Sequence, residues 1–305
     1  MIRWLSAVCD TAFFRVIFAS GGSRKLNGKV YVWRQEPKNT FTKTQAKEKR
    51  KLKEWKADPS CRAIGKGAFQ NNTKLKRVIL PENVKEVGIQ SFENTALRNV
   101  EMTAVESVQR EAFRSCSHLK GVFVPSTVNF IGKEAFAQCR NLKEVEIAKS
   151  CGCSEIIEQT FQDCESLTAV TLPDSLKKIG DRAFYKCKAL ETIVLPTGLK
   201  EIGTQAFYQT GLTSLTLPDG LQLIGDSAFL KCNQLKYVLI PESVNKIEKW
   251  AFHGCNRLQV LEIRHDLKDI GPWIINKAAR IRCRKGGTVD RYCREGGLTA
   301  EYIEE

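Results

Sequence analysis

Cysteine and histidine are the residues of this 305-residue chain that could act on a substrate or bind a metal, and there are twelve cysteines and three histidines. Six cysteines share one spacing, three residues after a phenylalanine: Cys116, Cys139, Cys164, Cys187, Cys232 and Cys255. Stacked turns of a chain lie about 4.8 Å apart, within the Cα separation of about 4.4 to 6.8 Å that a disulfide permits. Elsewhere the same position holds Asn72, Thr95 and Thr210, which are small and carry a hydrogen-bond donor. We therefore favour a row of free thiols that serve a turn carbonyl, with bridged pairs as the alternative.

Two further cysteine pairs stand outside this row. Cys151 and Cys153, in the segment 149–155, could supply two thiolates to zinc, but a tetrahedral site needs two more ligands and the sequence has no second C-x-C or C-x-x-C. We interpret the segment as a bulged loop, with metal or redox use as the alternative. Cys283 and Cys293 could close the C-terminal segment by a disulfide if the protein is exported, and remain reduced otherwise. We expect no cofactor and no metal.

The sequence carries no catalytic motif. It has no nucleophile elbow, phosphate-binding loop or histidine-rich metal motif, and His118, His253 and His265 fall at different positions of different repeats. We interpret these histidines as solvated surface residues. The recurring "IG" glycines mark a turn that tolerates only small residues, and they do not form a dinucleotide fingerprint. We therefore expect no catalytic residue and no enzyme.

A repeat of 21 to 25 residues organises the chain. One phenylalanine marks each copy: Phe69, Phe92, Phe113, Phe136, Phe161, Phe184, Phe207, Phe229 and Phe252. A second phrase of the form L-x-x-L-x-L lies between them, as in "LKEVEI" from Leu142. Its end alternates with period two, as a short strand requires, and proline often follows and ends the pairing. Nine copies predict a solenoid in which the phenylalanines form a continuous buried column, rather than an exposed binding stripe.

The combination L-x-x-V-x-L-P-x-x-L-x-x-I-G-x-x-A-F-x-x-C resembles the BspA-type leucine-rich repeat family over about residues 61–285. Residues 281–297 are similar to the segment that ends many of its arrays, with Cys283 where proline is common. The resemblance implies a surface or secreted protein that binds other proteins. The expected fold is an α/β-type solenoid, mostly of short parallel strands: a right-handed leucine-rich repeat solenoid with about nine coils of 21–25 residues and terminal caps. We expect a basic N-terminal extension (1–60), the solenoid (61–279) and a C-terminal cap (280–305).

The outward-facing strand positions are the surface that solenoids commonly use for recognition. In this row Tyr237, Leu239 and Val260 are expected to be adjacent and exposed near the C-terminal end. An apolar and aromatic cluster of this kind is typical of an interaction hot spot. We therefore predict these three residues as the ligand-binding site, for a protein partner that the sequence does not identify.

The net charge of +14 is concentrated near the N-terminus. Residues 1–60 carry 14 Lys/Arg against 5 Asp/Glu, a balance of +9, and the other residues carry 34 against 29, a balance of +5. Residues 28–34 alternate as a strand, and residues 42–59 predict a basic helix that Pro59 ends. Leu52 and Trp55 could cover the exposed end of the first coil, while a linker or a charged-ligand arm are alternatives. Nucleic-acid binding is not expected for the repeats, and residues 42–56 are the candidate for it.

Residues 1–20 contain no membrane span and only a short uncharged stretch for a signal peptide. An amphipathic helix there is the simplest interpretation, with export or organelle targeting as the alternative. We therefore favour a cytoplasmic location, with the cell surface or secretion as the alternative. The function we expect is non-enzymatic protein–protein interaction. The two alternatives are an adhesin that binds host or matrix proteins, and a nucleic-acid or acidic-lipid binder that uses the basic arm.

Overall fold

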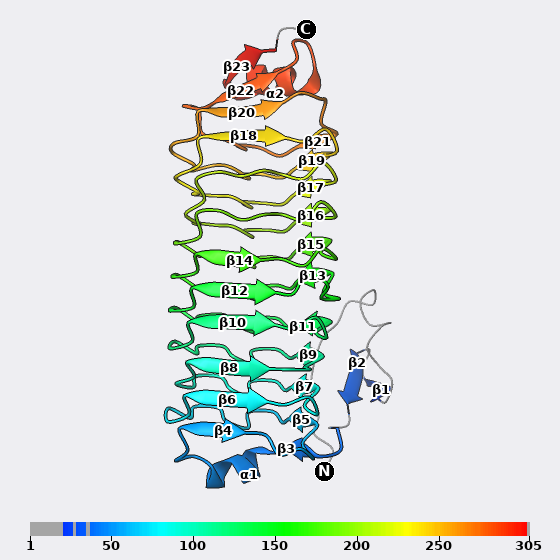
Figure 1. The fold of residues 1–305 in the computed structure, drawn as a ribbon. Helices are drawn as coiled ribbons and strands as arrows, with labels where there is room; N and C mark the ends of the chain where they lie inside the picture. The colour runs from blue at the N-terminus through cyan, green and yellow to red at the C-terminus, as the bar shows by residue number, and fades with distance from the viewer. Residues whose placement is uncertain (1–20, 27–28, 35–36, 304–305) are drawn as a thin grey trace.

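A computed structural model describes residues 21–26, 29–34 and 37–303, and residues 37–303 coil into a parallel-strand solenoid (Figure 1). Each turn has a short strand on one side and, in most turns, a longer strand on the other. The longer strands are β4 (Glu54–Lys56), β6 (Arg77–Leu80), β8 (Asn99–Met102), β10 (Gly121–Val124), β12 (Glu144–Ile147), β14 (Ala169–Thr171), β18 (Tyr237–Ile240), β20 (Val260–Ile263), β22 (Arg280–Cys283) and β23 (Thr299–Tyr302).

The short strands number the turns. They are β3 (Thr40–Phe41), β5 (Ala63–Ile64), β7 (Glu86–Val87), β9 (Ser107–Val108), β11 (Phe130–Ile131), β13 (Glu155–Ile156), β15 (Lys178–Ile179), β16 (Glu201–Ile202), β17 (Leu223–Ile224), β19 (Lys246–Ile247) and β21 (Asp269–Ile270). They form one ladder of five and one of six, so the described part of the chain makes eleven turns. The expected count of nine is too low because the first and last turns lack the marker phenylalanine.

The phenylalanines form the buried column that the repeat predicts. All nine rings are at most 2% exposed, and successive centroids lie 5.1 to 5.7 Å apart with planes within 14° of parallel. At the C-terminal end, Ile275 takes the column position, since the Phe252 amide bonds the Ile274 carbonyl as the Phe229 amide bonds the Ala251 carbonyl. The column is therefore a single core that runs the length of the solenoid.

The basic segment at the N-terminal end is part of the first turn, and the prediction of a helix over 42–59 is wrong for most of its length. Helix α1 (Lys43–Glu48) begins at a capping box made by Thr42 and Gln45, and β4 follows it. Trp55 is 8% exposed and its ring lies 4.8 Å from that of Phe69, because β4 pairs in parallel with β6 and places it against the column. Trp55 thus covers the first coil as expected, whereas Leu52 is 41% exposed.

Outside the solenoid, β1 (Gly21–Leu26) and β2 (Lys29–Arg34) pair antiparallel, which confirms the strand predicted over 28–34. The amphipathic or targeting segment predicted over 1–20 lies outside the described residues. Within the described ranges, no helix is long and apolar enough to cross a membrane.

The C-terminal end is closed by helix α2 (Thr288–Gly296) together with β23. Strand β23 adds in parallel to β22, and α2 buries Val289 and Cys293 against the last turns. The helix ends at Gly297, whose φ of 60° is the left-handed conformation that glycine adopts without strain. The C-terminal end therefore continues the longer-strand ladder by one strand beyond the repeats.

Candidate protein-binding face

The predicted binding residues lie on the sheet β18-β20-β22-β23. We call the outward-pointing residues of these four strands the C-terminal strand face. Its two rows follow from the parallel register: Tyr237, Val260, Arg280 and Thr299, then Leu239, Glu262, Arg282 and Glu301. Because alternate residues of a strand face opposite sides, the other residues of these strands, such as Val238 and Leu261, fill the core.

Tyr237 and Leu239 are exposed as predicted, at 45% and 39%. The expectation that Val260 is exposed is wrong, because only 8% of it is accessible. Val260 lies between Tyr237 and Arg280 in the register, and the tyrosine hydroxyl reaches diagonally along β20 to Glu262, 2.9 Å away. The longer side chains on both sides therefore cover the valine. The exposed apolar cluster consists of Tyr237 and Leu239.

Glu262 is the centre of a charge network beside this cluster. Its side chain is only 2% exposed, and it accepts hydrogen bonds from Arg264, Arg282 and the Tyr237 hydroxyl. Burial alone raises the pKa of Glu262, but these donors outweigh it and hold the pKa below its usual value. The pKa of Tyr237 is raised, first by desolvation and then by its bond to Glu262. The hydrogen bond to Glu262 restrains the tyrosine side chain on the face.

The network extends to the last strand of the sheet. Arg282 bonds Glu262 at 3.0 Å and Glu301 at 2.6 Å, so it links β20 to β23. Arg280 lies 3.5 Å from the other carboxylate oxygen of Glu301. These paired charges lie on one side of the apolar cluster, because β18 is the edge strand of the sheet.

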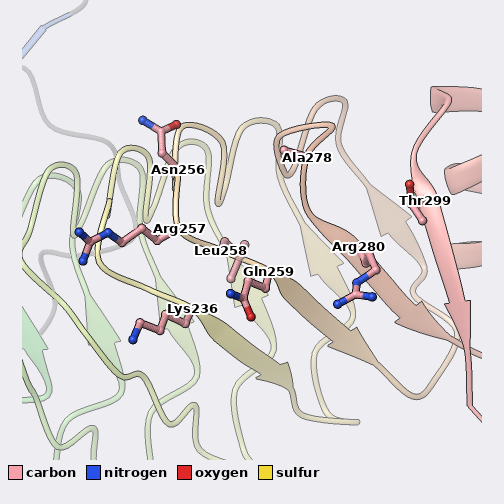
Figure 2. A pocket seen from close by; sticks show the side chains of 8 residues that line it. All are labelled: Lys236, Asn256, Arg257, Leu258, Gln259, Ala278, Arg280 and Thr299. Atoms are coloured by element: carbon pink, nitrogen blue, oxygen red, sulfur yellow. The ribbon is translucent and has the colours of Figure 1, made fainter.

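A shallow depression of about 640 Å³ opens at the starts of these strands (Figure 2). Its lining includes the cations Lys236, Arg257 and Arg280 and no carboxylate. The Arg257 guanidinium bonds the Gln234 side chain at 2.7 Å, which fixes it at one edge. The depression gives the C-terminal strand face a basic border next to Tyr237.

The sequence did not predict the network around Glu262. The C-terminal cap expected over 280–305 includes strand β22. The predicted face therefore lacks this strand and its two arginines. The alternation "RIRC" was the available signal, since it places Arg280 and Arg282 on one side and Ile281 and Cys283 on the other.

The thiols of the cysteine row serve turn carbonyls, as expected. Each of the six donates a hydrogen bond of 3.0 to 3.2 Å to the carbonyl of the column phenylalanine in the preceding turn. Thr95 and Thr210 donate to Phe92 and Phe207 in their own turns. All eleven described cysteines are buried and unbridged. The row is therefore a structural ladder of hydrogen bonds.

The other cysteines that the structure describes are buried, and the three histidines differ in exposure. The Cys151 thiol donates to the Val128 carbonyl at 3.0 Å, and both it and Cys153 are buried in the bulged loop. Among the described residues, no group of three His, Cys, Asp or Glu side chains could hold a metal. His118 is exposed, whereas His253 and His265 are half-buried, so the expectation of solvated histidines is wrong for these two. His265 instead places Nε2 2.8 Å from the Val244 carbonyl.

Known structures share this architecture. The chain is similar to the pneumococcal vaccine antigen PcpA, with 17% identity over 93% of this chain and 87% of that one and a TM-score of 0.52. It is also similar to a leucine-rich repeat protein from Bacteroides ovatus, with 24% identity over 92% and 90% of the two chains and a TM-score of 0.40. A Treponema pallidum repeat protein matches at 23% identity over 80% and 91%, with a TM-score of 0.41. Among curated proteins, none matches the chain.

The family assignment rests on the repeats themselves. The model of the BspA-type leucine-rich repeat region matches residues 40–153 and 154–281 with six copies, which is most of the chain. The matched region begins at β3, so it includes the first turn that lacks the marker phenylalanine. Proteins with this repeat are commonly interaction or surface proteins. The chain belongs to the BspA-type leucine-rich repeat family.

Proposed function

We propose that this protein is a non-enzymatic protein-binding module whose partner docks on the C-terminal strand face. The observation that carries the proposal is the pair Tyr237 and Leu239, which are large, exposed and held on a regular sheet beside a buried charge network. Aromatic anchors that are rigid before binding lose little conformational entropy when a partner covers them. The basic depression at the edge of this face would add charge selectivity.

The proposal is tested by comparing what the full chain and its variants retain from a protein mixture. A double variant, Tyr237→Ser and Leu239→Ser, removes the apolar cluster, and Val194→Ser is the matched control. Val194 is 84% exposed and occupies the position equivalent to Leu239 two turns earlier. We expect the parent and the Val194→Ser control to retain the same protein and the double variant to lose it. Retention of that protein by a folded double variant would contradict the proposed face.

A further inference from the structure

A second surface lies on the segment between each short strand and the cysteine row. We define the turn face by its position relative to each column residue from Phe69 to Ile275. It consists of the residue two positions before the column residue and the two residues that follow it. The backbone is left-handed in most turns at the residue two before and the residue two after the column position. Examples are Trp250, with φ of 57°, and Lys231, with φ of 61°. In the last five turns every turn-face side chain except that of Ser227 is exposed or half-buried. This surface is therefore distinct from the C-terminal strand face.

The charge of the turn face changes sign between Phe161 and Phe184. In the first five turns its charged residues are Glu93, Glu111, Glu134 and Asp163, with Arg114 as the one cation. In the last five turns they are Arg182, Lys186, Lys231 and Lys277, with no carboxylate. All four large aromatic residues of the turn face also belong to the last five turns: Tyr185, Tyr208, Trp250 and Trp273. We call these last five turns the basic half of the turn face.

The cations of the basic half have no carboxylate partner within the described residues. Arg182 bonds the Gln205 side chain at 2.7 Å, and Lys186, Lys231 and Lys277 lie beside aromatic rings. The first five turns of the turn face differ in their ion pairing, because Glu134 there is paired with Arg114 at 3.3 Å.

Two carboxylates next to the basic half, Asp181 and Asp226, have other partners. Asp181 accepts a hydrogen bond from the Thr204 amide, and Asp226 accepts one from the Ser227 hydroxyl and pairs with Lys249. Neither of these two carboxylates forms an ion pair with the four cations of the basic half.

The two tyrosines of this surface lie against each other and against lysine side chains. Tyr185 and Tyr208 stack on each other, with centroids 4.7 Å apart and planes 9° from parallel. Lys186 lies 5.1 Å from the Tyr185 centroid and Lys231 lies 5.9 Å from the Tyr208 centroid. Both tyrosines therefore have a neighbouring ring and a cation around them.

The two tryptophans extend the surface toward the C-terminal end. Trp250 and Trp273 are 41% and 51% exposed, with Lys249 and Lys277 beside their rings at 4.8 and 5.9 Å. Both occupy left-handed backbone, with φ of 57° and 60°, which is an uncommon conformation for a bulky side chain. The same left-handed backbone recurs at this position in other turns, so it belongs to the repeat, and the exposure of the two rings is what distinguishes these turns. The two rings supply the apolar contact area that a purely electrostatic patch lacks.

We infer that the basic half of the turn face binds an acidic segment of a partner protein. Its four cations, which have no carboxylate partner among the described residues, match the carboxylates of such a segment. Nucleic-acid bases and sugar rings need open aromatic faces, and the stacked tyrosines offer few of them. This surface is separate from Tyr237 and Leu239, so the inference and the proposed function can fail independently.

The test measures binding of a fluorescein-labelled 16-residue peptide of alternating glutamate and serine to the full chain by fluorescence anisotropy. The test variant carries Arg182→Gln, Lys186→Gln, Lys231→Gln and Lys277→Gln. The control variant carries Lys74→Gln, Lys76→Gln, Lys120→Gln and Lys143→Gln, which removes the same charge from exposed positions elsewhere. We expect at least tenfold weaker peptide binding by the test variant and less than a twofold change in the control.

Two further arms separate the ligand classes and the role of the tryptophans. The double variant Trp250→Ala and Trp273→Ala should weaken peptide binding about threefold or more, whereas Tyr237→Ser with Leu239→Ser should leave it unchanged. A 16-residue oligothymidylate and a sulfated oligosaccharide should compete more weakly than the unlabelled peptide. Equal loss in the two glutamine variants, no peptide binding by the parent, or tighter binding of either competitor would overturn the inference.

Discussion

The phenyl rings of Phe207 and Phe229 stack with centroids 5.2 Å apart and planes 2° from parallel. Neither ring is exposed to solvent, and each also stacks on the next ring of the column. Removing one ring therefore opens a cavity that its two neighbours border. Since each turn of a solenoid is stabilised by the turns next to it, the column couples the folding of the repeats.

Replacement of Phe207 by alanine should lower the free energy of unfolding by about 3 to 5 kcal/mol, as large-to-small changes in a packed core do. The measurement is urea denaturation followed by circular dichroism. The control is Tyr208→Ala, which truncates the half-buried next residue and should cost about 1 kcal/mol or less. Similar losses in the two variants would contradict the column as the stabilising core.

Gly225 is expected to tolerate no side chain. A Cβ atom there would lie 2.8 Å from the carbonyl carbon of Gly203 and 2.9 Å from the carbonyl oxygen of Ile202. Gly225→Ala must therefore push two turns apart and should destabilise the protein by about 1 to 3 kcal/mol. Gly121→Ala is the control, because its Cβ would meet only the Glu144 carbonyl oxygen at 3.9 Å. Thermal denaturation of the two variants compares them, and equal melting temperatures would refute the close-approach explanation.

The buried thiols of Cys164 and Cys187 should be unreactive in the native protein. Burial raises the pKa of both, so little thiolate forms at pH 8 and reagents cannot reach it. In a Cys9→Ser background, Ellman's reagent at pH 8 should leave both unmodified until urea unfolds the chain, with the sites assigned by mass spectrometry. A variant with Thr168→Cys, at an exposed position, should react at once. Native modification of Cys164 or Cys187 would contradict the hydrogen-bonded ladder.

Glu262 should stabilise the protein above its ordinary pKa near 4.5 and lose that effect as the pH falls. Its folded pKa is lowered, so the ionised form favours the folded state, and protonation removes that preference. Glu262→Gln should cost about 1.5 to 3 kcal/mol at pH 7, as expected for hydrogen bonds to a charged group. Urea denaturation at pH 7, 5 and 3 should show the difference between the parent and this variant shrinking toward pH 3.

The matched control for Glu262 is an exposed carboxylate in an ion pair. Glu101 pairs with Arg77 at 2.6 Å, but the side chains are 50% and 44% exposed. Glu101→Gln should therefore change the free energy of unfolding by about 0.5 kcal/mol or less. A difference between the parent and Glu262→Gln that stays constant from pH 7 to pH 3 would show that the carboxylate charge contributes nothing.

The repeat pattern alone determined the solenoid, the phenylalanine column and the placement of the cysteine row. These features recur in every turn, so the same local packing problem appears many times and its spacing is visible in the sequence. Cysteine at Cys116 and Cys139 and threonine at Thr95 and Thr210 occupy the same repeat position. Because both residue types are small and can donate a hydrogen bond, this exchange indicates a donor to a turn carbonyl. The family match and the eleven stacked turns bear out that fold.

The tertiary structure decided the backbone conformation where the repeat pattern is absent. It also decided the burial of residues that side chains from neighbouring turns cover. Trp55 leaves the predicted helix and lies in strand β4, which pairs with β6 and places its ring against Phe69. Val260 is covered and Glu262 is buried because Tyr237 and Arg282 reach them from neighbouring strands, about 20 to 25 residues away in sequence. Periodicity fixes which residue faces outward, but its exposure depends on the length and charge of the side chains stacked beside it.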